Sequence, residues 1–139
     1  MRLSCAALVA LTIAVLPVPS RAQDGVFVSY EAMRATLDGL MKSRSIADLM
    51  IVFGGADEMT EQQLAGLEGQ VRQIYPADFS EAAVMRHAEL ENGWSQEVIS
   101  YWTGVDYVYA YILMHDREDA FVAVNFRFNS DFSALNALF

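Results

Sequence analysis

Residues 94–129 read WSQEVISYWTGVDYVYAYILMHDREDAFVAVNFRFN, and this stretch decides the fold class. It is rich in the aromatic and β-branched residues that favour strands. The pair Thr103-Gly104 and the charged run 116–119 interrupt it in the way that hairpin turns do. We therefore predict three antiparallel strands, at roughly 94–102, 105–115 and 120–129.

The segment just before this stretch, residues 81–91, is compatible with two structures. Ser80 is a suitable N-cap for a helix that Gly93 would end, whereas Asn92-Gly93 is also a common hairpin turn. We predict a fourth strand here, and a helix is the alternative.

The first half of the chain has the opposite signature, because its apolar residues recur at helical spacing. Thr60 and Gln63 form a capping box, Pro76 ends the helix that follows, and Ser45 is a suitable N-cap for the helix before it. The apolar stripes are Met33, Leu37, Leu40 and Met41, then Ile46, Leu49, Met50 and Phe53, then Leu64, Leu67, Val71 and Ile74. The expected fold class is α+β, with N-terminal helices packed on an antiparallel sheet of three to four strands, and a short docking turn or helix over residues 131–139.

The chain begins with a segment of different composition, residues 1–22. It carries a positive charge at Arg2, continues with the almost entirely apolar run 6–16, and ends in small residues before Gln23. This is the pattern of a secretory signal peptide. Its apolar run is far shorter than the roughly 20 residues that span a bilayer. We expect cleavage before Gln23, no membrane insertion afterwards, and a single domain over residues 23–139.

Cleavage would change the composition of the protein. The single cysteine, Cys5, and two of the nine basic residues would leave with the signal peptide, so that seven basic residues remain against 18 acidic ones, a formal charge of −11. A strongly acidic surface repels nucleic acid and anionic membranes. We expect a periplasmic or secreted location and no nucleic-acid partner. We also expect no cofactor and no metal, because the chain has no Gly-rich phosphate loop, serine-hydrolase elbow or zinc motif.

Strand pairing predicts which residues share a face of the sheet. If the turns hold an even number of residues, alternate side chains of neighbouring strands lie together. We expect the helices to cover the aromatic face and a pocket to open there, because the polar tips of these side chains need partners once buried. The pocket would be lined by Trp94, Gln96, Ser100, Trp102, Tyr107, Tyr109 and Tyr111. Plain core packing is the alternative for the three tyrosines.

The opposite face of the predicted sheet carries a second row of side chains. It contains Ile99, Tyr101, Val108 and Ala110 between charged residues. If this face is open, it is apolar enough for a symmetric sheet-to-sheet homodimer.

The order of elements resembles the nuclear-transport-factor-like, or cystatin-like, α+β fold group. The resemblance rests on N-terminal helices followed by aromatic-rich strands such as residues 107–113, and it covers most of the chain after residue 22. It implies that the sheet is strongly curved around a cone-shaped cavity. Members of this group include isomerases, dehydratases and non-enzymatic binding or assembly modules. We match none of their acid–base residues to a position of this sequence, so the resemblance carries over no catalytic residue.

Two further groups of residues could carry chemistry. His87 and Glu89 lie on the same side of the fourth strand, as a base and its orienting carboxylate would. An even turn at Asn92-Gly93 would point both toward the tyrosines. A three-residue turn would place them on the opposite face as a surface pair, and we favour that arrangement. The run 115–119 has one histidine and several carboxylates but no metal-ligand spacing, so we expect an exposed hairpin tip.

These patterns lead to two functions. The preferred one is a non-enzymatic module that binds a small apolar ligand or a protein partner through the aromatic sheet. The alternative is a cofactor-free isomerase, dehydratase or hydrolase, in which Tyr107, Tyr109 or Tyr111 donates a hydrogen bond and His87 or Glu89 acts as base. The direction of the His87 side chain separates them. A direction toward the tyrosines favours the enzyme, and a direction toward solvent favours the binding module.

Overall fold

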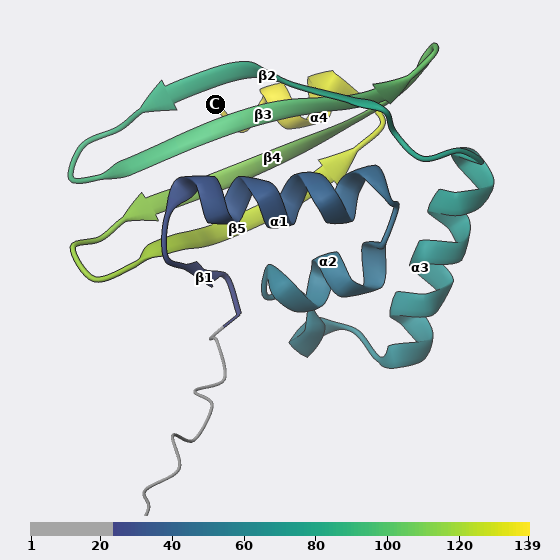
Figure 1. Ribbon diagram of the computed structural model, residues 1–139, viewed down its shortest axis with the longest axis horizontal. Helices are drawn as coiled ribbons and strands as arrows, with labels where there is room; N and C mark the ends of the chain where they lie inside the picture. Colours follow the sequence, from purple (N-terminus) through teal and green to yellow (C-terminus); the bar gives the residue numbers. More distant parts are fainter. Residues whose placement is uncertain (1–23) are drawn as a thin grey trace, which may run out of the picture.

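The computed structural model describes residues 24–139, which form four α-helices and a five-stranded antiparallel sheet (Figure 1). The helices of this part are α1 (Tyr30–Lys42), α2 (Ile46–Val52), α3 (Glu61–Ile74) and α4 (Phe132–Asn136), with a 3-10 turn, η1 (Ala56–Glu58), after α2. The strands are β1 (Val26–Phe27), β2 (Glu81–Glu89), β3 (Trp94–Thr103), β4 (Asp106–Asp116) and β5 (Phe121–Asn129), in the spatial order β1-β5-β4-β3-β2. The α+β class and the predicted strand near 81–91 are confirmed, and β1 adds a strand to the predicted three or four. The predicted signal peptide lies outside the described residues.

The helices α2 and α3 begin where the sequence predicts them, and α1 begins after Ser29, which was not predicted as a cap. The Ser29 side chain accepts a hydrogen bond from the Ala32 backbone at the start of α1. Thr60 and Gln63 form the predicted capping box of α3. Ser45 precedes α2 as expected, but its side chain makes no capping hydrogen bond. Within residues 24–139, no helix is both long and apolar enough to cross a membrane.

The turns set the predicted strand pairing, with one exception. Thr103 pairs with Asp106, so β3 and β4 are joined by a two-residue turn, and their alternate residues share faces as predicted. We expected the same alternation of faces to continue along the whole of β5. It does not, because a bulge at Val124 breaks the register of β5 with β4. Beyond the bulge, Phe126 and Phe128 lie opposite Ile112 and Ala110, on the other face from the tyrosine row.

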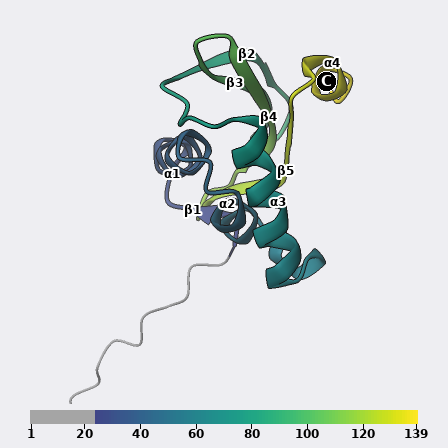
Figure 2. The ribbon, with the colours of Figure 1, turned by 90° about the vertical axis from the view of Figure 1, so that its right-hand side faces the viewer.

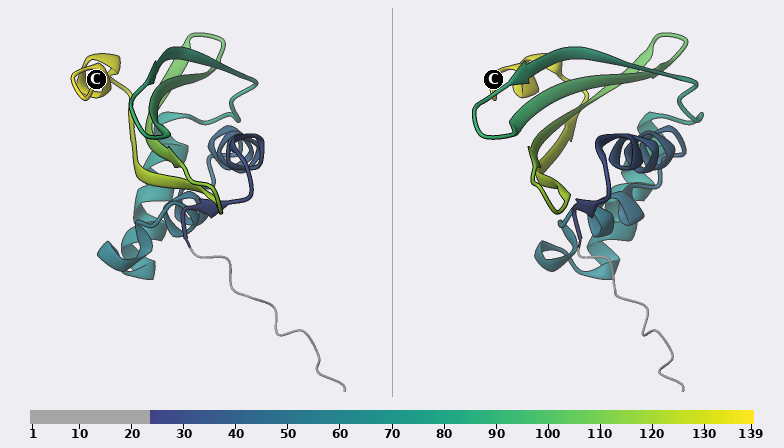
Figure 3. Two further views of the ribbon diagram at one scale, coloured as in Figure 1. Left: turned by 90° about the vertical axis from the view of Figure 1, so that its left-hand side faces the viewer. Right: turned by 60° about the vertical axis from the view of Figure 1, so that its left-hand side comes forward.

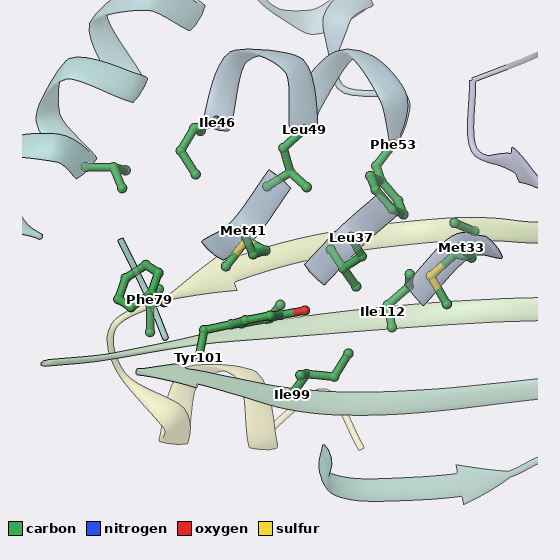
Figure 4. Packing of buried hydrophobic residues seen from close by; sticks show 14 of the residues in the cluster. Met33, Leu37, Met41, Ile46, Leu49, Phe53, Phe79, Ile99, Tyr101 and Ile112 are labelled. Atoms are coloured by element: carbon green, nitrogen blue, oxygen red, sulfur yellow. The ribbon is translucent and has the colours of Figure 1, made fainter. Parts of the chain in front are cut away.

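The helices cover the face that we predicted to be open. The main core joins α1 and α2 to Ile99, Tyr101, Val108, Ala110 and Ile112 of β3 and β4. Figure 4 shows Met33, Leu37 and Met41 of α1, Ile46 and Leu49 of α2, and Phe53 directly after α2, packed against this face. The prediction of a helix-covered tyrosine face is therefore wrong, and the Ile99 face is not available for a sheet-to-sheet dimer. The physical reason is that both rows of β3 and β4 are apolar enough to be buried, so packing against α1 and α2 decides which of them is covered.

The other face of the curved sheet is covered only in part, by α4. Figures 2 and 3 show α1 and α4 on opposite sides of the sheet. Leu135 of α4 is buried against Val98 of β3 and Tyr111 of β4, and these three residues form a second, smaller core. The predicted docking helix in the C-terminal segment is thus present, and it divides the outer face into a covered centre and an exposed margin.

Candidate functional site

The residues predicted to line a pocket lie together, but on the outer face of the sheet. The strand register places Trp94, Gln96, Ser100, Trp102, Tyr107, Tyr109 and Tyr111 on this face, opposite the residues that α1 and α2 cover. The Tyr111 hydroxyl donates to Gln96 Oε1 over 3.0 Å, and Ser100 Oγ donates to the Ala83 carbonyl over 3.2 Å. Among the described residues, no buried side-chain nitrogen or oxygen lacks a partner.

The physical argument for that pocket therefore fails, because the buried polar groups of this row have partners within the protein and its more exposed groups need none. Tyr107 is 44% exposed at the margin of the face, and its ring stacks with the rings of Trp102 and Tyr109. Tyr109 in turn packs edge-on against Phe132 of α4. Ligand binding by this aromatic row stays a prediction.

A cleft of about 400 Å³ lies on the other side of the sheet, and we call it the His87 cleft. It is found where the β2–β3 and β4–β5 hairpins turn, beside the first turn of α1. Its walls are formed by Tyr30, His87, Glu89, Leu90, Gly93, Trp94, Ser95, Glu97, Asp116 and Phe121. Of the residues predicted to bind a ligand, only Trp94 contributes to it.

The β2–β3 turn explains why His87 faces this cleft. Leu90 donates its backbone N–H to the Trp94 carbonyl, which leaves a three-residue turn with Asn92 and Gly93 in the left-handed region. This is the favoured alternative of the sequence analysis, and it places His87 opposite Glu97, away from the tyrosine row. A bulge at Met85 shifts the earlier half of β2 against β3. His87 is therefore directed neither toward Tyr107, Tyr109 and Tyr111 nor freely into solvent, but into a cleft beside Tyr30.

Glu97 is the centre of a hydrogen-bonded group at the base of the cleft. The residue is 3% exposed, and Tyr30 donates its hydroxyl to both carboxylate oxygens, at 2.8 and 3.0 Å. His87 Nδ1 lies 3.1 Å from Glu97 Oε1. A carboxylate only accepts hydrogen bonds, so Nδ1 carries the proton and Nε2 is the nitrogen left for a ligand. Nε2 lies 3.9 Å from Glu89 Oε1, at the mouth of the cleft.

A second layer on α1 supports this group. Arg34 donates to the Tyr30 hydroxyl over 2.9 Å, pairs with Asp38 at 3.2 Å, and lies 3.7 Å from Glu97 Oε2. Tyr101, fully buried in β3, donates its hydroxyl to Asp38 over 2.7 Å. The side chains of Tyr30, Arg34 and Asp38 follow one another at four-residue spacing, which places them on one side of the helix.

Burial and neighbouring charges act on the proton affinities of this layer. Burial raises the pKa of Tyr30, and its hydrogen bond to Glu97 raises it further. Burial also raises the pKa of Tyr101 strongly, together with its hydrogen bond to Asp38. For Arg34, burial opposes the charged form, but its hydrogen bond to the Tyr30 hydroxyl and the charge of Asp38 give a net rise in its pKa. The layer thus holds Arg34 charged and both phenols protonated.

The sequence analysis singled out His87 and Glu89 but missed Tyr30, Arg34 and Glu97. A signal for Glu97 was present, because it is the only charged residue of the strand predicted at 94–102. A signal for the others was the polar spacing of Tyr30, Arg34 and Asp38 in a predicted helix. Neither signal shows which helix residue meets which strand residue.

Two other parts of the described chain are weaker candidates for a functional site than the His87 cleft. A larger hollow of about 690 Å³ lies between β5, α4 and the end of α2, but Glu58 and Arg127 are its only charged lining residues. The predicted hairpin tip is exposed at residues 117–119, where Arg117 pairs with Asp119 at 3.1 Å. Within residues 24–139, no three histidine, cysteine or acidic side chains are grouped so that they could hold a metal ion.

No protein-family model, no curated protein and no solved structure matches this chain.

Proposed function

We propose that this domain binds a small organic molecule in the His87 cleft and works outside the cytoplasm. The observation that carries the proposal is the buried Glu97 carboxylate, held by Tyr30 and His87 at the base of a cleft. Burying a charge costs free energy, and a strand that only had to fill a core would have an apolar residue at this position. A partnered charge beside an open cleft is typical of binding and catalytic sites. The secreted location is supported by the signal-peptide pattern of residues 1–22.

A screen of small organic fragments by NMR, with ¹⁵N-labelled protein, tests the binding proposal. We expect a subset of fragments to shift the backbone amides of Leu90, Ser95 and Glu97. Ser95→Trp, which fills the cleft from β3, should abolish these shifts. Val105→Trp, at a position that is 90% exposed in the β3–β4 turn, is the control and should keep them. A screen in which no fragment shifts the cleft amides would contradict the proposal.

Proton transfer is a second candidate function of the same cleft, and one observation favours it. The contact between Glu97 and His87 Nδ1 fixes the imidazole and leaves Nε2 to take a proton from a bound molecule, as in acid–base enzymes. Tyr30 replaces the three predicted tyrosines as the nearby phenol. In deuterated water, exchange of a ligand C–H in wild-type protein, and its loss in His87→Gln with binding retained, would separate catalysis from binding.

A further inference from the structure

The residues that line the His87 cleft carry an unequal balance of charge. Three of them, Glu89, Glu97 and Asp116, are acidic, and His87 is the only basic one. A neighbouring hollow shares Tyr30, Asp116 and Phe121 with the cleft, so the two lie side by side. That hollow adds Glu31, Glu118 and Asp119, and its one basic residue, Arg117, is paired with Asp119.

Other positive groups near the cleft are already engaged. Arg34 lies behind Tyr30, is paired with Asp38 at 3.2 Å and lies 3.7 Å from Glu97, so it offsets part of the Glu97 charge. The N-terminus of α1 contributes a partial positive charge of roughly one half, but Glu31 stands in its first turn. The field inside the cleft is therefore negative.

Glu89 and Asp116, at the mouth of the His87 cleft, have carboxylate oxygens that are free to accept hydrogen bonds. Glu97 is occupied by Tyr30 and His87, whereas the side chains of Glu89 and Asp116 accept no hydrogen bond from any other residue in the range 24–139. They come from different hairpins, β2–β3 and β4–β5, and so approach the cleft from two strands.

Aromatic rings complete the cleft wall. Tyr30 and Phe121 pack edge-to-face with their centroids 5.8 Å apart. Aromatic faces attract cations, and the Arg34 guanidinium already lies 5.9 Å from the centre of the Tyr30 ring. Carboxylates combined with aromatic walls suit a charged amine whose carbon part is apolar, and no grouping of metal ligands exists among the described residues.

We infer that the ligand of the His87 cleft is a small organic cation, of the primary-amine class. This inference rests on the proposed function and narrows it to one class of ligand. A volume of about 400 Å³ admits a molecule with one ring and a short aminoalkyl chain. The aromatic walls would contact the ring, and Glu89 and Asp116 would accept hydrogen bonds from the ammonium group.

Three probes of the same shape test the inference: 2-phenylethylamine, 2-phenylethanol and phenylacetate. Their affinities for the secreted protein are measured by NMR titration near neutral pH at low salt, where the amine is charged. We expect the amine to bind at least about tenfold more tightly than the alcohol, which corresponds to about 1.4 kcal/mol, and the carboxylate to bind most weakly. Added salt should reduce the preference.

Two double variants with the same net charge test whether the preference for the amine comes from the cleft or from the overall charge of the protein. Glu89→Gln with Asp116→Asn should remove most of the preference for the amine. Glu58→Gln with Glu81→Gln makes the same change in net charge at exposed positions outside the cleft lining, and should leave the preference intact. Circular dichroism checks that both variants fold.

The contrary results distinguish failure of the cation inference from failure of the proposed function. If the alcohol or the carboxylate binds at the cleft amides as tightly as the amine, the cation inference is wrong and the cleft remains a binding site. If both variant pairs lose the preference equally, the amine responds to net charge and the inference is again wrong. If no probe shifts the cleft amides although other fragments do, the cleft takes another class of molecule. If the fragment screen also finds nothing there, the proposed function fails as well.

Discussion

Glu97 stands at a strand position whose following residues, Val98 and Ile99, are completely buried. An isolated carboxylate at this depth would cost several kcal/mol, so its place depends on the donors around it. Those donors come from two separate elements, Tyr30 at the start of α1 and His87 in β2. One buried residue thereby fixes the position of the first helix against the second strand.

At the same scale, Tyr101 makes the stability of the protein sensitive to alkaline pH. Because its pKa is raised in the folded state, the folded protein keeps a phenol proton that the unfolded chain loses above a pH of about 10. The free energy of unfolding should therefore be unaffected below that pH and fall above it, by up to about 1.4 kcal/mol per pH unit for each such tyrosine. Burial also raises the pKa values of Tyr30, Tyr75 and Tyr111, which add to this slope.

Tyr101→Phe should make the free energy of unfolding less dependent on pH in the alkaline range. We expect a loss of about 1 kcal/mol at neutral pH, since the hydrogen bond to Asp38 disappears, and a shallower decline above pH of about 10. Urea unfolding across this pH range measures both effects. Met114→Leu, in the same core and without a titratable group, is the control and should keep the wild-type slope. Equal slopes for wild type and Tyr101→Phe would show that Tyr101 does not contribute to the loss of stability at alkaline pH.

Among the elements, α4 depends most on packing. It has five residues, too few for a helix that is stable alone, and it rests on Val98 and Tyr111 through Leu135. Arg86 of β2 adds a hydrogen bond to Asn136 and lies over the Phe139 ring at 4.2 Å. The C-terminal segment therefore joins strands β2, β3 and β4 on the outer face.

Leu135→Ala should lower the free energy of unfolding by about 3 kcal/mol, because it leaves a cavity in the smaller core. Leu138→Ala, at a position that is 38% exposed, should cost less than about 1 kcal/mol. Urea unfolding of both variants gives the comparison. Similar small losses would mean that α4 contributes little to the stability of the sheet.

Local signals in the sequence were sufficient to predict most elements, but not how they face one another. The capping box at Thr60 and the strand at 81–91 depend on neighbouring residues, and both are confirmed. The turn expected at Thr103-Gly104 has the even length that the face assignment assumed, but it lies at Gly104-Val105. β1 has only two residues and exists because it pairs with β5, so no periodicity could indicate it. The covered face was predicted wrongly because both rows of β3 and β4 are apolar. The choice between them is made by packing against α1 and α2.

The His87 cleft was beyond sequence reasoning for a related reason. It depends on the packing of α1 against the sheet, which brings Tyr30 to Glu97, and on the pairing of β2 with β3, which puts His87 opposite Glu97. No local pattern in the sequence shows these contacts between distant elements. The resemblance to the nuclear-transport-factor-like fold group stays a prediction.

For the whole molecule, the sequence predicts removal of residues 1–22. Ser20 and Ala22 are small residues at the positions that a signal peptidase recognises. The intact mass of protein from the periplasm or the medium should correspond to residues 23–139. Ala22→Arg should block processing and give the mass of the full chain. Recovery of wild-type protein that retains its first 22 residues would contradict the prediction.

The pairing of β1 with β5 brings together residues from the two ends of the described chain. The helices α1 and α2 are synthesised early, yet the strands that bury Met33, Leu37 and Leu49 follow much later. Contacts between such distant parts of a chain slow folding, because a long loop must close before they form. An emerging chain therefore exposes the apolar sides of its first helices until β4 and β5 have been made. The native core can close only when these strands, which end at Asn129, are present.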